Sequence, residues 1–434
     1  MIRVEKIIPG GQSLGTNEDG KKIFFWNALP GEVVEEYEVT KNKSHYQEAI
    51  ATKISNPSQY RVEPLDECYL STSPWQIIDY THELQLKQEL VTEIFREHHI
   101  NIDTPEIITD GKDYHYRNKM EYALYWDHDT NKIHLAFHQR GSHRKIPINS
   151  SSIERPEIFT KAQQIVDDLN ASHDEARRYQ SLLLRCNQQG EVSGGLYENH
   201  QPHPVFPPLS DEILGHFYTY SPNGFFQINL PVYEMALTEI KRHITTDAVL
   251  DLYSGVGTIG LSVAPTHHLT LVECDKHAYS ELVENCKRHD SFEHLESGNS
   301  ATRGLPEVTT EDEGASPVTT GASDPSREST ISDSKRVRNG DIFGFLAKSE
   351  DSLDYINRNQ TVILDPPRSG CDKHLINKLL EVTPEKIIYL SCNPATQARD
   401  ISLLFDKYKI TTVKTFNFFP HTPHIENLVI LSRK

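Results

Sequence analysis

The sequence has few cysteines, and no two of them are close together in the chain. Six cysteines are scattered over 434 residues, and no Cys-X-X-Cys pair occurs. Zinc knuckles and thiolate-held iron–sulfur clusters need closely grouped cysteines, so we expect no metal site. Scattered, unpaired cysteines are also typical of a reducing compartment.

Long apolar runs are missing as well. No stretch of about 18 consecutive apolar residues occurs, so we expect no membrane-spanning helix. The opening residues, MIRVEKIIPGGQS, lack the apolar core of a signal peptide. These two absences predict a cytoplasmic protein without a membrane partner.

The sequence also lacks an excess of basic residues. The formal net charge is -18, but binding a phosphate backbone needs only a local group of lysines and arginines. Part of the acidity lies in 293–337, which is rich in Ser, Thr, Gly, Glu and Pro and poor in large apolar side chains. Such a composition cannot offset its own ordering entropy, so we expect a disordered surface insertion there. The charge therefore does not exclude nucleic acid as a partner.

Length and pattern indicate three regions, because 434 residues exceed one ordinary core. Residues 1–62 alternate short β-like pieces with turn signals such as Pro9-Gly10-Gly11, which predicts a small closed β-barrel. Residues 63–215 indicate a central α+β region. Residues 216–434 predict a mainly parallel, Rossmann-like α/β sheet. Its apolar strand candidates are 248–252, 269–273, 361–365, 386–391, 411–416 and 427–432.

Basic and aromatic residues are interleaved in the central region. Two strand candidates there, joined by a tip at 127–131, carry Arg117, Lys119, Arg140 and Arg144 among several tyrosines. Single-stranded RNA favours this mixture of cations and stacking rings. A solvated, half-buried hairpin explains it equally well, so both interpretations stay open.

A glycine-rich motif follows the first strand candidate of the α/β region. The segment DLYSGVGTIG satisfies Gly-X-Gly-X-X-Gly through Gly255, Gly257 and Gly260. Glycines let a backbone approach a ligand closely, and Glu273 at the end of the next strand can bind ribose hydroxyls. Nicotinamide dehydrogenases and S-adenosylmethionine enzymes share this device. Asp251 ahead of the glycines and Asp365-Pro-Pro at the end of the strand candidate 361–365 favour S-adenosylmethionine.

Cys392 and Glu426 form a candidate reacting pair. Cys392 ends the apolar strand IIYLS, and Glu426 immediately precedes the last apolar strand. Methylating a pyrimidine at C5 needs a thiolate that adds to C6 and a base that later removes the C5 proton. Arg368 after the two prolines, where an aromatic residue suits amino-group methylation, turns the prediction away from adenine and cytosine amino groups. Taken singly, a buried core cysteine and an exposed strand-cap acid are the simpler interpretations.

Several motifs together resemble the RNA (uracil-C5)-methyltransferase family, with an N-terminal start similar to its TRAM domain, an OB-like RNA-binding barrel. They follow the order and spacing of that family over almost the whole chain outside the insertion. The motifs are YRNKMEY, LAFHQRGSH, FFQIN, DLYSGVGTIGL, LVECD, LDPPRSGCD, YLSCNPATQARD and HIENLVIL.

The resemblance implies an S-adenosylmethionine-dependent methylation of uridine C5 in structured RNA, through a covalent adduct between Cys392 and C6. It implies Glu426 as the proton acceptor and cofactor contacts from Gln227, Tyr253, Thr258, Glu273 and Asp365. Ribosomal RNA is favoured over transfer RNA by the TRAM-like start, and no DNA partner is expected. The alternative is a catalytically silent RNA-binding or assembly factor on the same fold.

One departure from the family concerns iron. Many relatives hold a [4Fe-4S] cluster through a Cys-rich segment after the TRAM domain and one later cysteine. Here only Cys68 remains, and 150–152 is a run of serines. Because such a cluster needs four ligands, we expect none in this chain.

Overall fold

The N-terminal part of the chain is a closed five-stranded barrel. The computed structural model describes residues 1–172, 178–198, 200–203, 205–264, 267–296, 336–339 and 341–434. The barrel strands are β1 (Ile2–Ile7), β2 (Ser13–Thr16), β3 (Lys22–Trp26), β4 (Val33–Asn42) and β5 (Tyr46–Ser55), joined in the order β1-β2-β3-β5-β4. Alternate residues, including Ile23, Phe25 and Val34, point into its small core. The predicted barrel is therefore confirmed.

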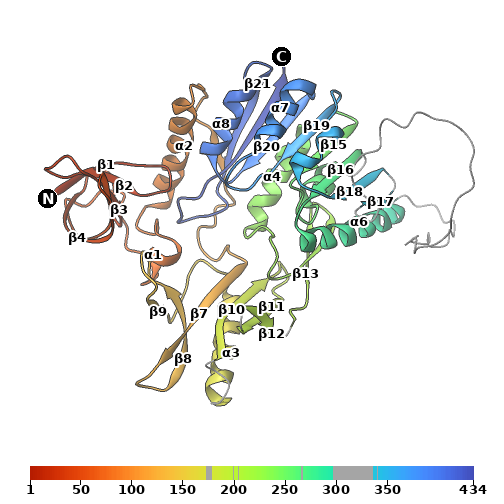
Figure 1. Ribbon diagram of the computed structural model, residues 1–434. Coiled ribbons are helices and arrows are strands. Elements are labelled where there is room, and N and C mark those ends of the chain that lie inside the picture. The colour runs from red at the N-terminus through yellow and green to blue at the C-terminus, as the bar shows by residue number, and fades with distance from the viewer. Residues whose placement is uncertain (173–177, 199, 204, 265–266, 297–335, 340) are drawn as a thin grey trace, which may run out of the picture.

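A six-stranded sheet forms the central part of the molecule, at the bottom of Figure 1. Its order is β12-β11-β10-β7-β8-β9, and the helix α3 (Pro156–Ser172) packs on it. The strands are β7 (Lys119–Asp127), β8 (Lys132–His138), β9 (Lys145–Pro147), β10 (Tyr179–Cys186), β11 (Val192–Glu198) and β12 (Gln201–His203). Strands β7 and β8 form the predicted hairpin, in which Asp127 pairs with Lys132. A separate hairpin, β13 (Leu209–Ile213) and β14 (His216–Tyr220), leads towards the C-terminal sheet.

The C-terminal part is built on a nine-stranded sheet with the order β17-β18-β16-β15-β19-β20-β22-β21-β6. All pairings are parallel except those of β22 with its two neighbours and that of β17 with β18. The six predicted strands are present, and β6, β17 and β18 are additional. The strands are β6 (Glu106–Ile108), β15 (Ala248–Leu252), β16 (His268–Glu273), β17 (Arg336–Asn339), β18 (Ile342–Leu346), β19 (Gln360–Leu364), β20 (Lys386–Ser391), β21 (Tyr408–Phe416) and β22 (Glu426–Arg433).

Helices cover both faces of this sheet. Successive residues of β20 show the two sides, because Ile387 and Tyr389 belong to one core cluster and Ile388 and Leu390 to the other. The first cluster includes side chains of α2 (Tyr80–Glu97), α7 (Lys373–Val382) and α8 (Pro394–Leu404). The second includes side chains of α4 (Leu230–Arg242), α5 (Thr258–Val263) and α6 (Lys276–Glu296). One-turn elements lie at α1 (Tyr69–Thr72), η3 (Ser349–Asp351) and η4 (Leu353–Tyr355).

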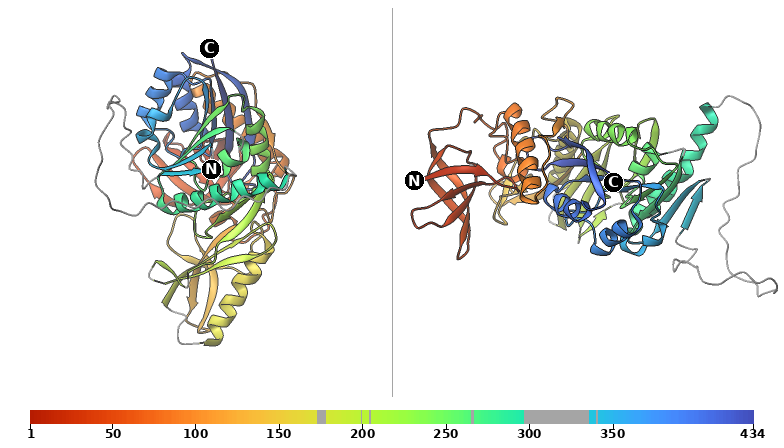
Figure 2. Two further views of the ribbon diagram at one scale, coloured as in Figure 1. Left: turned by 90° about the vertical axis from the view of Figure 1, so that its right-hand side faces the viewer. Right: turned by 90° about the horizontal axis from the view of Figure 1, so that it is seen from above.

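The expected central region, 63–215, is shared between two cores. Strand β6 pairs with β21 at the edge of the C-terminal sheet, and α2 packs against α8. In the right-hand view of Figure 2, α2 stands between the barrel and the sheet. Helix α2 therefore links the barrel to the part of the molecule that carries Cys392.

The expected insertion at 293–337 falls largely outside the described residues. Its first residues complete α6, and its last two, 336 and 337, begin β17. In the part of the chain that the structure describes, no helix is both long and apolar enough to cross a membrane.

Candidate active site

The sheet brings Cys392 and Glu426 together. Strands β20 and β22 are antiparallel, and their last pair joins Ser391 to Asn427. Continuing this register by one residue places Cys392 opposite Glu426, which is the first residue of β22. Asp365 follows β19, the other neighbour of β20, so all three groups lie at the carboxyl edge of the parallel strands. Open α/β sheets bind their ligands at this edge.

A buried amide network holds this edge in place. The Gln397 side chain of α8 donates to the backbone oxygens of Tyr389 (2.8 Å) and Asn427 (3.0 Å), and accepts from Asn427 Nδ2 at 2.7 Å. Thr415 of β21 donates to Asn427 Oδ1 at 3.0 Å. Gln397, Asn427 and Thr415 are fully buried. The network therefore connects β20, β22 and β21 directly next to the candidate reacting pair.

The three groups perturb one another's ionisation. Burial raises the pKa of the Cys392 thiol to about 11, with smaller contributions from the Glu426 and Asp365 charges, while a hydrogen bond from Arg368 acts in the opposite direction. Burial and the nearby Asp365 carboxylate raise the pKa of Glu426 well above its ordinary value. Burial also raises the pKa of Asp365 to about 7. The shifts favour the protonated forms of both carboxyl groups, and the thiol is mostly protonated at neutral pH.

We expect the alkylation of Cys392 by iodoacetamide to be slow at neutral pH and to accelerate by about tenfold per pH unit between roughly pH 7 and 9. The reason is that only the thiolate reacts, and its fraction rises with pH below a pKa of about 11. The variant R368Q removes the hydrogen bond that favours the thiolate, so its alkylation should be slower at each pH. Peptide mass spectrometry resolves Cys392 from the other cysteines. A rate that is independent of pH over this range would contradict the raised pKa.

Cys392 lies in a pocket of about 310 Å³, near the lower end of the usual range for small-ligand sites. Its walls come from distant parts of the chain: Pro9 and Gly10 of the barrel, Leu90 and Ile94 of α2, Arg368, the segment 392–395 and the segment 423–425. His424 in the last segment is close to four cations, and burial together with the charges of Arg368, Lys87, Arg117 and Arg140 lowers its pKa to about 4. The His424 imidazole is therefore neutral at physiological pH.

The glycine loop offers space for a cofactor. Gly255 and Gly257 have φ of +57° and +89°, and a Cβ atom on Gly255 would meet nothing within 4 Å. A Cβ atom on Gly260 would instead lie 2.5 Å from Leu271, because the helix α5 packs closely on β16. In such motifs one glycine lets the backbone approach the ligand, and another lets the helix pack closely on the strand. The open space beside Gly255 and the close packing at Gly260 match these two roles.

Two acidic residues anchor this loop. Glu273 accepts from the backbone N–H groups of Gly255 (2.7 Å), Cys274 (2.7 Å) and Asp275 (2.6 Å). Its Oε2 accepts only one of these bonds and has capacity for a hydroxyl group. Asp251 accepts from Gly260 N–H at 2.9 Å, while its buried Oδ1 has no hydrogen-bond partner. The residues thus fit a ligand that carries ribose hydroxyl groups.

The other predicted cofactor residues lie around the same loop. Tyr253 has a positive φ of 66°, and its hydroxyl group interacts with Ser349 and with the backbone of Asp372. Thr258 begins α5 and is buried. Gln227 is also buried, and its backbone oxygen accepts from Asn118 at 3.0 Å.

The four predicted RNA-binding residues have different surroundings in the structure. The charges of Arg117 and Arg140 act on His424 and contribute to its lowered pKa. Lys119 Nζ donates to the backbone oxygens of Asn223 and Gly224, at 3.1 Å each. Arg140 donates to Leu70 O and lies over the Trp26 ring of the barrel, with 4.2 Å to the ring centroid. Arg144 is exposed on the loop between β8 and β9.

Cys68 is buried in the core cluster of the central sheet, next to a polar group around Asp66. Asp66 accepts hydrogen bonds from the side chains of Gln76 (2.8 Å) and Ser152 (2.7 Å), and Gln76 also donates to Ser73 Oγ at 2.6 Å. Burial, and next the Asp66 charge, raises the pKa of the Cys68 thiol to about 12. A single, strongly protonated thiol among these groups does not fit a four-thiolate cluster. Among the residues that the structure describes, no three His, Cys, Asp or Glu side chains are grouped to hold a metal ion.

Residues 347–434, which contain Asp365, Cys392 and Glu426, match the model of the family tRNA (Uracil-5-)-methyltransferase. This part of the chain is similar to that family. Proteins described as uncharacterized RNA methyltransferases are similar over nearly the whole chain. The one from Bacillus cereus is 25% identical over 97% of this chain and 95% of its own. The one from Prochlorococcus marinus is 28% identical over 90% of this chain and 96% of its own.

A solved structure is similar to this chain over nearly its full length. It is the Pyrococcus abyssi tRNA (uracil-54, C5)-methyltransferase in complex with S-adenosyl-L-homocysteine, with a TM-score of 0.68 and 20% identity over 99% of this chain and 100% of that one. The chain thus has the fold of an S-adenosylmethionine-dependent methyltransferase. The strand order agrees, because β22 stands antiparallel between β20 and β21, a position that the dinucleotide-binding order does not have.

Sequence reasoning assigned no catalytic role to two side chains of this candidate site. Arg368 hydrogen-bonds to the Cys392 thiol, and His424 Nδ1 lies 3.4 Å from Arg368 Nη2. Both had a usable signal, since Arg368 directly follows Asp-Pro-Pro and His424 stands two residues before Glu426. Phe225, two residues before Gln227 in FFQIN, is 74% exposed and was likewise given no role.

Proposed function

We propose that this protein methylates C5 of uridine in structured RNA, with S-adenosylmethionine as the methyl donor. What supports the proposal is Cys392 in the lining of a pocket of about 310 Å³, with the buried Glu426 next in register on the neighbouring strand. A thiol and a carboxyl group in this arrangement can act on one pyrimidine in succession. Such a pocket takes a single base, so the target uridine must leave its stack to enter it.

In the proposed reaction, the Cys392 thiolate adds to C6 of the uracil ring, which makes C5 nucleophilic. When bound, the cofactor supplies an electrophilic methyl group, and Gly255, Gly257, Glu273, Tyr253 and Thr258 would hold it, together with Gln227 and Asp365. C5 takes the methyl group and still carries its hydrogen. Glu426 then accepts this hydrogen as a proton, the electron pair reforms the C5–C6 double bond, and the sulfur–C6 bond breaks.

We assign His424 a role at the carbonyl oxygen of the base. Arg368 can only donate, so His424 Nδ1 must accept across their 3.4 Å contact. The proton of the neutral imidazole is therefore on Nε2, which can donate a hydrogen bond to the uracil O4 as negative charge develops there.

The variant H424N should lower kcat by roughly 100-fold, in line with the loss of one donor to a developing oxyanion. The variant H424Q should retain more activity, because a glutamine amide reaches the position of Nε2 and an asparagine amide does not. Steady-state kinetics with saturating RNA provide the measurement, and cofactor affinity should stay unchanged in both variants. Equal activity of H424N and the parent protein would remove this role.

The RNA class is the finer part of the proposal. We propose ribosomal RNA as the first candidate, on the TRAM-like character of the N-terminal barrel, which we also expect to bind RNA. The similar Pyrococcus abyssi protein is named for tRNA and is matched over 99% of this chain, so the barrel alone does not separate the two classes. Both RNAs therefore belong in the test.

The test is methyl transfer from radiolabelled S-adenosylmethionine to unmodified transcripts of ribosomal and transfer RNA. We expect label in 5-methyluridine at a defined position, which nuclease digestion and mass spectrometry identify. A silent assembly factor would instead bind RNA and cofactor without labelling any uridine. Label on a nitrogen or a ribose oxygen would contradict the proposed chemistry.

A further inference from the structure

The pocket around Cys392 is completed by the N-terminal barrel. Pro9 and Gly10, in the turn between β1 and β2, line it together with Pro423 and His424. Both turn residues are exposed, and a Cβ atom on Gly10 would meet nothing within 4 Å. One wall of the proposed uridine site thus comes from a part of the chain almost 400 residues away from Cys392 in sequence.

The turn is seated firmly on the catalytic part. Gly11 O accepts from Trp75 Nε1 at 3.0 Å, and Trp75 N in turn donates to His421 O at 3.0 Å. Gly11 has φ of +90°, and a Cβ atom there would lie 2.1 Å from Pro423 Cβ. Only glycine fits between the barrel and Pro423, so the position of Pro423 depends on this turn.

The segment on which the turn rests is held from behind by α2. Lys87 Nζ donates to Asn417 Oδ1 (2.7 Å) and Phe419 O (3.0 Å), and Glu83 accepts from His421 N at 2.9 Å. Lys87 and Glu83 also pair with each other at 2.7 Å, and both are fully buried. A rigid support on one side means that a displacement of the turn is passed to Pro423 and His424.

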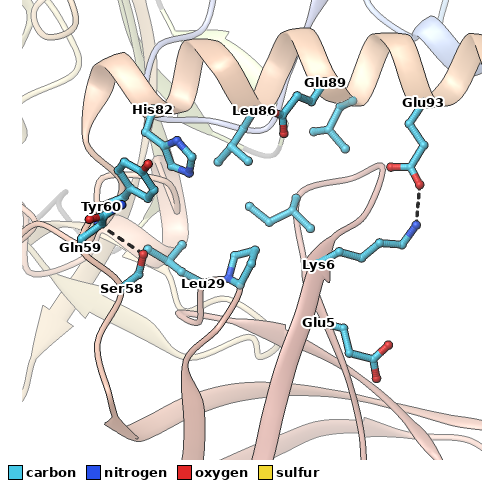
Figure 3. Close-up of a pocket in the computed structure, with 13 residues that line it drawn as sticks. Glu5, Lys6, Leu29, Ser58, Gln59, Tyr60, His82, Leu86, Glu89 and Glu93 are labelled. Carbon is cyan, nitrogen blue, oxygen red and sulfur yellow. Dashed lines mark hydrogen bonds and ion pairs between the residues drawn. The ribbon is translucent and has the colours of Figure 1, made fainter.

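Elsewhere the barrel meets α2 across a hollow. Figure 3 shows this second cavity, of about 520 Å³, between the side chains of α2 above and those of the barrel below. An ion pair between Lys6 and Glu93 at 2.5 Å bridges it, while Tyr60 and His82 stack at 3.6 Å on another side. Leu90 lines both this cavity and the Cys392 pocket. The barrel is therefore held by separate contacts around a cavity, and the Gly11 contact is made with Pro423, which lines the Cys392 pocket.

We propose that the Pro9–Gly11 turn is a substrate-selecting wall of the active site, which contacts the nucleotide that flanks the target uridine. The inference rests on the proposed function. Because the pocket accommodates one base, the neighbouring nucleotide must lie at its rim, and Pro9 and Gly10 form the rim on the barrel side. The proline ring offers an apolar face to a base, while Arg368, which also lines the pocket, supplies positive charge for its phosphate.

The experiment compares two glycines of the barrel with the same backbone conformation. Gly11 and Gly31 have φ of +90° and +88°, but a Cβ atom on Gly31 would meet nothing within 4 Å. The variants G11A and G31A thus share the backbone strain, and only G11A displaces Pro423. Each is incubated with cofactor and with 5-fluorouridine-containing transcripts of ribosomal and transfer RNA, and the covalent complex is quantified on denaturing gels.

We expect G11A to trap RNA about tenfold more slowly or worse, since small misplacements at a reacting centre have large effects, while G31A stays within about twofold of the parent protein. Cofactor affinity should be unchanged in both. The variant P9A, which introduces no strain, should raise the KM for RNA by about fivefold with little change in kcat, as expected for a lost stacking contact.

The outcomes separate the two proposals. If the parent protein traps no RNA, the proposed function fails. If the parent protein traps RNA and folded G11A traps it equally fast, the assignment of the turn fails while the function stands. If G11A does not fold, P9A decides, and an unchanged KM overturns the assignment.

Discussion

Replacement of Cys392 by alanine is expected to abolish both methylation and the covalent complex with 5-fluorouridine RNA. The reaction proposed here begins with a bond from this sulfur to C6, and alanine offers no nucleophile in its place. The loss of turnover should be at least about 10⁴-fold, as for other enzymes that lose a covalent nucleophile. Measurement combines denaturing gels for the adduct with methyl incorporation into unmodified RNA.

The matched control is C371A. Cys371 lies next to the same sheet edge, 3.6 Å from the Tyr389 hydroxyl group, but it is buried and does not line the pocket. Its removal should leave trapping near the level of the parent protein. Trapping by C392A at the rate of the parent protein would exclude Cys392 as the nucleophile.

The second large effect is expected for E426Q, which should transfer the methyl group and then stall. Glutamine keeps the shape of the side chain but cannot accept the C5 proton, so the sulfur–C6 bond cannot break. A methylated covalent complex should therefore accumulate on ordinary uridine-containing RNA, and turnover should fall by about 10³-fold, within the range of a lost general base. Gels with labelled methyl groups detect the complex directly.

E385Q is the matched control for this variant. Glu385 immediately precedes β20, at the opposite end of the strand from Cys392, and it is only partly buried. The same chemical change there should leave turnover within about twofold. Normal turnover by E426Q would show that another group removes the proton.

Much of the C-terminal sheet could be predicted because its strands are continuous apolar runs. Buried parallel strands have no polar face, so segments such as 386–391 stand out between helical stretches. The sequence also places Cys392 and Glu426 at strand ends. It does not show that they face each other, because this depends on β22 standing antiparallel between β20 and β21. That pairing joins strands that are not consecutive in the chain.

Contacts between distant segments account for what the sequence did not show. Helix α2 is recognisable from its apolar spacing, but its packing against α8 rather than within the central region depends on tertiary structure. Arg140 stands in the sequence among basic and aromatic residues of the kind that bind RNA. In the structure its guanidinium group lies over Trp26 of the barrel. Strand β18 was missed because it is a short strand directly after the long polar stretch.

The hydrogen bonds between Asp66, Gln76 and Ser152 join the segment after the barrel to the segment before α3. These hydrogen bonds can form again whenever the two segments meet. They need neither delivered iron nor cluster sulfur, which oxygen can attack. Purification in air and refolding from urea should therefore return the same molecule.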